Sequence, residues 1–307
     1  MRSIAAPTPS PHVGELSAHT TSAHEYIASR HSASTRRAYG QDLIDFNLWG
    51  RASGLDTLPA SVDAVVLYVA MLADKGLKPS TICRKVSAIR FSHAQAGLSS
   101  PTAAEPVRAV LAGIKRVKGS KPRQVAPATI EVVEQMLAAC EASPRGIRDR
   151  ALIAIGFGAA LRRSELAAMQ VEDVSIGPRG LTILVRRSKT DPEGRGQTVA
   201  VLNGSRLGVT RLLEDWLEQS GRRTGPLFSL TDRQIANVIK SRASLAGLDA
   251  NEFSGHSLRA GFITTAAQTG ADIFRLMDVT RHRSVNTVRG YVRQAKQFDD
   301  HAGAAFM

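Results

Sequence analysis

The charged residues that follow the apolar run 151–161 are not explained by packing. Arg162 stands at the end of this run, and Glu165 follows three residues later. An arginine at the end of a buried helix needs an anionic partner, and Glu165 at this spacing can supply one. A structural ion pair is therefore one interpretation. The other is phosphate binding, because a guanidinium group matches phosphate with two parallel hydrogen bonds.

Histidines and a lone tyrosine occur nearer the C-terminus. His256 and Arg259 stand three residues apart, so on a helix they share one face. Equally, Ser257 could cap that helix and His256 could be a hydrogen-bonded core residue. Tyr291 is the only tyrosine after Tyr68 and would ordinarily be a core residue as well. These residue types nevertheless suit proton transfer and nucleophilic attack.

Taken in chain order, these residues resemble the tyrosine recombinase or phage integrase family. The family pattern is Arg, a Lys in a β-hairpin, His-x-x-Arg, then His or Trp, then Tyr. The runs 187–190 and 256–261 are similar to the Cre-like branch of that family, whereas Arg281 departs from the glycine that many members have before the second histidine. The matching catalytic residues are Arg162, Glu165, Lys189, His256, Arg259, His282 and Tyr291.

The resemblance implies a site-specific DNA recombinase that needs no metal and no cofactor. Tyr291 would attack the phosphodiester and form a 3′-phosphotyrosyl intermediate. Arg162 and Arg259 would neutralise the non-bridging oxygens in the transition state. Lys189, on a mobile hairpin, would protonate the leaving 5′-oxygen.

The remaining residues of the pattern would assist this reaction. His256 and His282 would donate hydrogen bonds or carry protons, and Glu165 would orient Arg162 or His256. By the same resemblance, four protomers would assemble on two inverted-repeat sites in double-stranded DNA and exchange strands through a Holliday junction. We expect the C-terminal tail, about 294–307, to dock on a neighbouring protomer, and a tail folded on its own domain is the alternative.

The composition independently favours a nucleic-acid partner. Lys and Arg number 40 against 27 Asp and Glu, which gives a net charge of +13 and a pI near 10.4. Such a charge attracts polyanions, and no basic amphipathic helix of the membrane-surface type stands out. We expect an intracellular, cytoplasmic protein with two free thiols, because the sequence has no signal peptide, no long apolar run and only two cysteines.

The basic residues that are candidates for DNA contact fall into two groups. The stretch from Pro106 to Ile130 contains six basic residues and no acidic residue, which is costly unless an anion is near. A second group lies on two expected helices, about 34–50 and 80–97, that would face the major groove. The candidates are Arg36, Arg37, Arg84, Lys85, Arg90, Lys115, Arg116, Lys118, Lys121 and Arg123.

The periodicity predicts a mainly α protein with two domains. After a flexible tail, 1–20, apolar residues at helical spacing predict an all-helical domain at 21–114, and the family resemblance implies that it is a DNA-binding domain of the SAM-like type. A basic linker at 115–127, rich in Gly and Pro, leads into a catalytic domain at 128–307. Segments 181–185 and 198–202 predict a small antiparallel hairpin within that domain, and the rest of it is predicted to be helical.

Three other functions stay open from the sequence alone. A type IB topoisomerase or a telomere resolvase uses the same residue set, although the small two-domain layout favours a recombinase. A catalytically silent regulator derived from an integrase would bind DNA without cleaving it. An unrelated basic helical protein would require every motif to coincide by chance.

Overall fold

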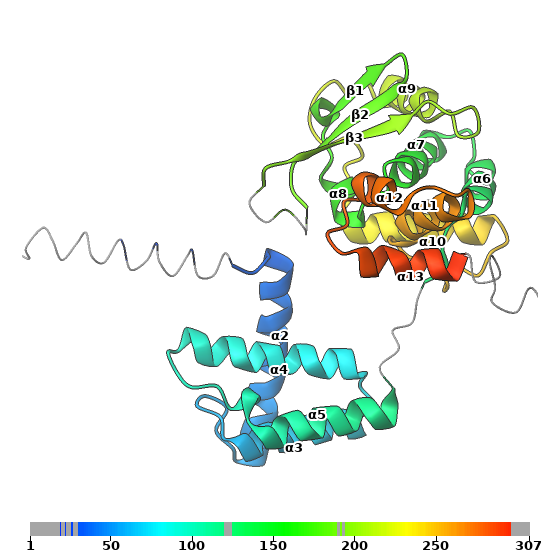
Figure 1. Ribbon diagram of the computed structural model, residues 1–307. Coiled ribbons are helices and arrows are strands. Elements are labelled where there is room, and N and C mark those ends of the chain that lie inside the picture. Colours follow the sequence, from blue (N-terminus) through cyan, green and yellow to red (C-terminus); the bar gives the residue numbers. More distant parts are fainter. Residues whose placement is uncertain are drawn as a thin grey trace, which may run out of the picture. The chain divides into compact units, whose positions relative to one another are not determined.

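The structure of the chain is a computed structural model that describes residues 30–119, 125–188, 191 and 194–295, together with residues 19, 22 and 26. It divides into two compact units, 1–122 and 123–307 (Figure 1). Most of the expected tail 1–20, the middle of the expected linker and the C-terminal segment 296–307 lie outside the described residues. Among the described residues, no helix combines the length and the apolar character needed to cross a membrane.

The N-terminal unit is a helical bundle around an aromatic and aliphatic core. Phe46 and Tyr68 lie 4.7 Å apart between ring centroids, and Ile82 and Ile89 pack with them. The helix starts follow local chemistry, because Ser61 caps one helix with its hydroxyl and Pro79 opens the next. The helices are α2 (Ala33–Ser53), α3 (Val62–Asp74), α4 (Pro79–Gln95) and α5 (Glu105–Lys118).

Two boundaries in this unit differ from the sequence-based expectation. The cap of α2 is Ser32, whose hydroxyl accepts a hydrogen bond from Thr35 N, so the helix begins at Ala33 and runs to Ser53, whereas a helix at about 34–50 was expected. The last helix continues to Lys118, so residues 115–118 of the expected linker are helical. Basic side chains suit the last turn of a helix because they interact favourably with its free carbonyl groups.

The C-terminal unit packs helices against one three-stranded antiparallel sheet. Leu152, Ile155 and Leu213 of the helices join Ile183 and Val199 of the sheet in one core. The strands are β1 (Val174–Gly177), β2 (Gly180–Val185) and β3 (Gln197–Leu202), in that order. The helices are α6 (Ile130–Ala138), α7 (Pro144–Gly158), α8 (Arg163–Ala168), α9 (Val209–Ser220), α10 (Asp232–Leu245), α11 (Ser257–Gln268), α12 (Ile273–Thr280) and α13 (Val285–Ala295).

The expected hairpin is present, and a further strand extends it. Strands β2 and β3 pair with Leu181 opposite Val201 and Ile183 opposite Val199, so the apolar side chains share the buried face. The sequence did not indicate β1. That strand has only four residues, with two apolar side chains, and none of them is buried, so it is too short for its pattern to signal a strand.

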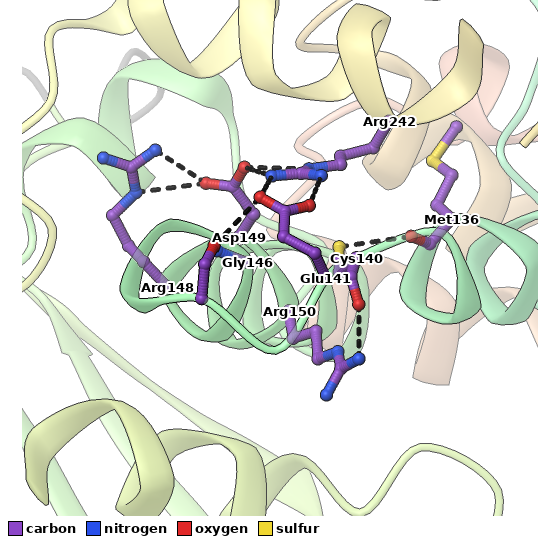
Figure 2. Close-up of polar contacts among 9 residues, drawn as sticks. Met136, Cys140, Glu141, Gly146, Arg148, Asp149, Arg150 and Arg242 are labelled. Atoms are coloured by element: carbon purple, nitrogen blue, oxygen red, sulfur yellow. Dashed lines mark hydrogen bonds and ion pairs between the residues drawn. The ribbon is translucent and has the colours of Figure 1, made fainter. Parts of the chain in front are cut away.

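A partly buried ion-pair cluster ties α10 to α7 and to the segment that precedes α7 (Figure 2). Arg242 Nη2 lies 2.7 Å from Asp149 Oδ2 and also contacts Glu141, while Arg148 Nη2 lies 2.8 Å from the other Asp149 oxygen. Asp149 and Arg242 are both buried, so each replaces the water that the other has lost. Burial raises the pKa of the neighbouring Cys140 to about 11, so this thiol stays protonated at neutral pH.

A close backbone approach fixes the start of α11 to the chain that enters the C-terminal unit. Ala128 N donates to Ser257 O at 2.9 Å, and Ile130 N donates to Thr265 Oγ1 at 3.1 Å. A Cβ at Gly261 would lie 1.7 Å from Ala128 O, so only glycine fits on this face of the helix. Because α11 begins directly after His256, these contacts also set the position of that histidine.

We therefore expect Gly261→Ala to lower the free energy of unfolding by about 3 kcal/mol, because the new methyl group overlaps backbone that cannot move aside. Denaturant unfolding of the full chain measures this change. The matched control is Gly113→Ala, which lies within α5 with no atom within 4 Å of the new Cβ. That variant should be neutral or stabilising by up to about 1 kcal/mol. Equal effects of the two substitutions would contradict the proposed backbone contact.

Candidate active site

The centre of the candidate site is the carboxylate of Glu165 at the start of α8. Arg162 Nη1 donates to Glu165 Oε1 at 2.6 Å, and the Arg162 backbone N–H donates to Oε2 at 2.9 Å. Arg281, which follows α12, donates from Nη2 to the same Oε2 at 2.7 Å. Glu165 and Arg281 are buried, whereas the Arg162 side chain is 17% exposed. Of the two arginines, Arg162 is thus the one that an incoming phosphate can reach.

The arginine next in sequence points elsewhere. Arg163 Nη2 lies 2.9 Å from Asp232 Oδ2 on α10, so it does not share Glu165. The stem of Arg163 also passes close to Gly255, where an added Cβ would lie 2.3 Å from Arg163 Cδ. The geometry therefore supports Arg162, rather than Arg163, as the arginine of this site.

His256 and Tyr291 form the pair of side chains in this site that could take part in a covalent reaction. His256 stands at the N-terminus of α11, and Tyr291 lies on α13, a helix that packs against α11 (Figure 1). The His256 Nε2 atom lies 3.1 Å from the Tyr291 hydroxyl oxygen. A histidine at this distance can exchange a proton with the phenol.

Arg259 lies on α11, three residues after His256, and is fully buried. Its Nη1 donates to Ala160 O at 2.8 Å, and its Nη2 donates to Thr280 O. Nη2 also lies 3.2 Å from His282 Nε2, while His282 Nδ1 lies 2.7 Å from Thr280 Oγ1. Since an arginine can only donate, this network assigns the proton of a neutral His282 to Nδ1. Arg259 thus becomes a fixed cation under the site.

The site keeps its histidines neutral and its carboxylate ionised. Burial, together with the charges of Arg259 and Arg162, lowers the pKa of His282 to about 4 and lowers that of His256 as well. Burial also raises the pKa of Tyr291, so the phenol is protonated at neutral pH. For Glu165, burial raises the pKa, but the charge of Arg281 and the hydrogen bonds from Arg162 outweigh it and hold the pKa below its usual value.

The charges that result suit an anionic substrate. Burial, then the charges of Arg162 and Arg281, lowers the pKa of Arg259 to about 9, which still leaves it cationic at neutral pH. Three guanidinium cations therefore surround one carboxylate, and the excess of positive charge matches a phosphodiester. Within the described ranges, no group of His, Cys, Asp and Glu has a metal-binding arrangement.

Two residues of this site were not assigned a role from the sequence. Arg281 was noted only as a departure from the family pattern, and Thr280 was not noted at all. A charged residue beside His282, directly after an amphipathic helix, was the available signal for Arg281. The expected Lys189 lies outside the described residues, although β2 and β3, the strands that flank it, are described.

The expected DNA contacts of the N-terminal unit separate by burial. Arg36, Arg37 and Arg90 are exposed, and the Arg84 side chain is 44% exposed while its Nη1 lies 3.0 Å from Asp42 Oδ2. Of the basic residues on α5, Lys115 and Arg116 are exposed, and Lys118, also exposed, donates to Ala73 O. Lys121 and Arg123 lie outside the described residues.

Lys85 is a correction to the candidate contacts. Its ammonium lies 3.1 Å from Asp42 Oδ1 and 2.6 Å from Asp45 Oδ2, and its side chain is 7% exposed. The sequence placed Lys85 beside Arg84 on a basic helix but did not show which of the two faces the core. The geometry gives Lys85 a structural role, because a buried ammonium paired with two carboxylates is not available to DNA.

Comparison with known proteins finds relatives over most of the chain. The model of the phage integrase family matches residues 128–297, and that of the phage integrase N-terminal SAM-like domain matches residues 23–96. The integrase/recombinase XerD homolog of Selenomonas ruminantium is 37% identical over 287 residues, which are 87% of this chain and 84% of the relative. Recombinase Cre of Escherichia phage P1 is 26% identical and covers 83% of this chain and 82% of its own.

Solved structures share the fold. The Tn1549 transposon integrase in complex with transposon right end DNA matches with a TM-score of 0.63 and 14% identity, over 89% of this chain and 96% of that chain. XerH site-specific recombinase, bound to a palindromic difH substrate, matches with a TM-score of 0.62 and 20% identity, over 85% and 76%. At these identities the likeness supports the fold alone.

The depressed pKa of His282 has a consequence for stability. In the unfolded chain this histidine takes up a proton near its ordinary pKa of about 6.5, whereas in the folded chain it does so only near 4. The unfolded state therefore binds more protons between these values, and the folded state loses stability as the pH falls from 6.5 to 4. We expect the free energy of unfolding of His282→Asn to depend less on pH between these two values. Unfolding at several pH values measures this, and an NMR titration of His282 with an ordinary pKa would contradict it.

The burial of Lys85 predicts opposite effects for two substitutions on α4. Lys85→Met should lower the free energy of unfolding by about 3 kcal/mol, because it leaves the buried Asp42 without its ammonium partner. Arg90→Met should leave stability unchanged but weaken binding to duplex DNA and reduce the slope of log affinity against log salt by about 0.9. Thermal unfolding and DNA binding at several salt concentrations test both. Weaker DNA binding by a fully stable Lys85→Met variant would restore Lys85 as a DNA contact.

Proposed function

The chain belongs to the phage integrase family and is a tyrosine-type site-specific recombinase, and we propose that Tyr291 is the nucleophile with which it cleaves duplex DNA. The family model spans 128–297, a range that includes every candidate catalytic residue. The relative from Selenomonas ruminantium, 37% identical, extends the similarity over 87% of the chain.

The observation that carries the assignment is the contact between His256 and Tyr291. These residues are 35 positions apart in sequence, yet the imidazole Nε2 lies 3.1 Å from the phenol oxygen. Arg259 belongs to the same site, because it contacts His282 and its charge acts on both His256 and Tyr291. A phenol, a neutral base and buried cations at one point form the arrangement that phosphoryl transfer to an oxygen nucleophile needs.

The cleavage step follows from this arrangement. The Tyr291 oxygen attacks the scissile phosphorus, the new bond forms a 3′-phosphotyrosyl link, and the bond to the 5′-oxygen breaks. His256 is neutral, so its Nε2 can accept the proton that the phenol releases. Religation reverses these movements, with a 5′-hydroxyl of the partner strand as the nucleophile. The free energy of the broken bond is retained in the covalent intermediate, and no external energy source is required.

Guanidinium groups supply the charge neutralisation that other phosphodiester-cleaving enzymes take from metal ions. Arg162 presents its partly exposed side chain to the non-bridging oxygens, and Arg259 adds its charge from the buried side of the site. Arginine suits this task because it stays charged and donates in a planar fork. Loss of one such donor typically slows a reaction by about 100-fold or more.

The general acid of this proposal is Lys189. It follows Arg187-Ser188 at the end of β2, where the family pattern has its hairpin lysine. A lysine there would protonate the leaving 5′-oxygen when the hairpin closes over the DNA. The support for this role is sequence position, together with the pairing of β2 and β3.

Site-specific recombination of this type requires several protomers. We include in the proposal a homo-tetramer on two inverted-repeat sites, joined through a Holliday junction and through the C-terminal tail. The support is the family membership and the palindromic substrate of XerH, a structure with the same fold. In the N-terminal unit the exposed Arg36, Arg37 and Arg90 are the leading DNA contacts, and Lys115 and Arg116 at the end of α5 are further candidates.

Capture of a covalent adduct tests this function directly. The protein is expressed together with DNA from its own locus and is denatured, and the DNA attached to it is sequenced. We expect adducts joined through 3′-phosphates, clustered at an inverted repeat, and lost completely in Tyr291→Phe.

The matched control is Tyr68→Phe. This change also removes a single phenol oxygen, one that is buried in the N-terminal unit and has no hydrogen-bond partner among the described residues. It should leave the adducts in place. Scattered adducts that depend on Tyr291 would indicate a topoisomerase, and DNA binding without any adduct would indicate a silent DNA-binding regulator.

A further inference from the structure

Arg281 occupies a backbone position that favours glycine. Its φ of 56° and ψ of 44° place it in the left-handed region directly after α12. A side chain with a Cβ adopts this conformation only at a cost in free energy. Ala160, with a φ of 47°, is a second non-glycine residue of this kind, and its carbonyl group accepts a hydrogen bond from Arg259. Unusual backbone of this sort tends to occur where function constrains the chain.

Burial of the Arg281 guanidinium group is a second cost in free energy, because the charge has lost its contact with water. Nη2 donates to Glu165 Oε2 at 2.7 Å, and Nη1 donates to Val279 O at 3.1 Å and to Ala159 O at 3.4 Å. The side chains of Arg281 and Glu165 are 3% and 1% exposed, so neither charge is well solvated. The ion pair with Glu165 is a contact that can offset these two costs, because it pairs the buried guanidinium group with a buried carboxylate.

Glu165 divides its two oxygens between two cations. Oε1 accepts from Arg162 Nη1 at 2.6 Å, and Oε2 accepts from Arg281. If Arg281 were absent, the single charge of Glu165 would be matched by Arg162 alone. Arg162 would then form a neutral pair and offer little charge to a phosphate. With Arg281 in place, the three groups together keep one positive charge, and Arg162, whose side chain is 17% exposed, is the most exposed of the three.

We propose that Arg281 is a positioning residue that neutralises Glu165, so that this carboxylate can fix the direction of Arg162 without cancelling its charge toward the scissile phosphate. The inference rests on the proposed recombinase function. It assigns to Arg281 a role in the reaction that extends beyond holding the end of α12 against α8.

The first test is the rate of covalent-adduct formation on a nicked duplex that carries the recombination site and traps the intermediate. Arg281→Gly suits the backbone and removes the guanidinium group, and we expect it to slow adduct formation at least about 10-fold. Arg281→Met keeps the length of the side chain without the charge and should be equally slow. Arg281→Lys keeps a charge near Glu165 and should recover part of the rate.

A second substitution separates charge balance from packing. In an otherwise wild-type chain, Glu165→Gln removes the carboxylate that orients Arg162 and should slow the reaction. In the Arg281→Gly background the same change removes the uncompensated negative charge, so it should raise the rate of that variant. A structural brace between Arg281 and Glu165 predicts no such recovery, because the double variant lacks both halves of the brace.

A substrate with a methylphosphonate at the scissile position gives a readout that does not depend on the folded fraction. Its linkage carries no charge, so it gains less from Arg162. We compare the rate of adduct formation by Arg281→Gly with that of the wild type on each substrate. We expect this rate to fall at least about 10-fold on the phosphate substrate but much less on the methylphosphonate substrate. Arg275→Met, which removes an exposed charge from α12, is the control and should change both substrates by the same factor.

The outcomes distinguish this inference from the proposed function. Absence of adducts in the wild type overturns the recombinase function, and the role of Arg281 with it. Wild-type adducts together with an Arg281→Gly variant of equal rate overturn the role of Arg281 alone. So does a slow variant that loses the same factor on both substrates and shows no recovery with Glu165→Gln, because that pattern describes a purely structural contact.

Discussion

The guanidinium groups of Arg162, Arg259 and Arg281 lie close together and repel one another. The buried carboxylate of Glu165 offsets part of this repulsion. Glu165 contacts Arg162 and Arg281, and its charge also favours the charged form of the fully buried Arg259. Burying a cation away from water is costly unless an anion or a set of carbonyl groups replaces the water. The buried cations therefore depend on where α8, the residues after α12 and the start of α11 are placed.

The backbone supplies the rest of the solvation that these cations need. The carbonyl groups at the end of α7, on Ala159 and Ala160, accept from Arg281 and Arg259 respectively. Carbonyl groups at the end of a helix have no partner within the helix, so they are available to such donors. Thr280 O, at the end of α12, serves Arg259 in the same way. Helix ends in this unit therefore act as fixed partial negative charges beneath the site.

The two units handle positive charge in opposite ways. In the C-terminal unit Arg162, Arg259 and Arg281 together carry more positive charge than Glu165 balances. In the N-terminal unit Lys85 is buried and is matched by Asp42 and Asp45, while Arg90 on the same helix is left exposed. A high net charge alone therefore does not identify the residues that contact DNA. Burial and pairing determine which of the basic residues are available for it.

The sequence by itself determined the helical character, the β2–β3 hairpin and the order of the candidate catalytic residues, because helix and strand periodicity and short motifs are local properties. The tertiary structure alone decided which acidic residue a basic residue contacts and which of two adjacent basic residues is buried. It paired Arg163 with Asp232, buried Lys85 beside the more exposed Arg84, and joined Arg281 to a carboxylate 116 residues away. Such pairings depend on how helices pack, and helix packing is set by many side chains at once. A local pattern of residues carries no record of it, just as it carried no signal for the exposed strand β1.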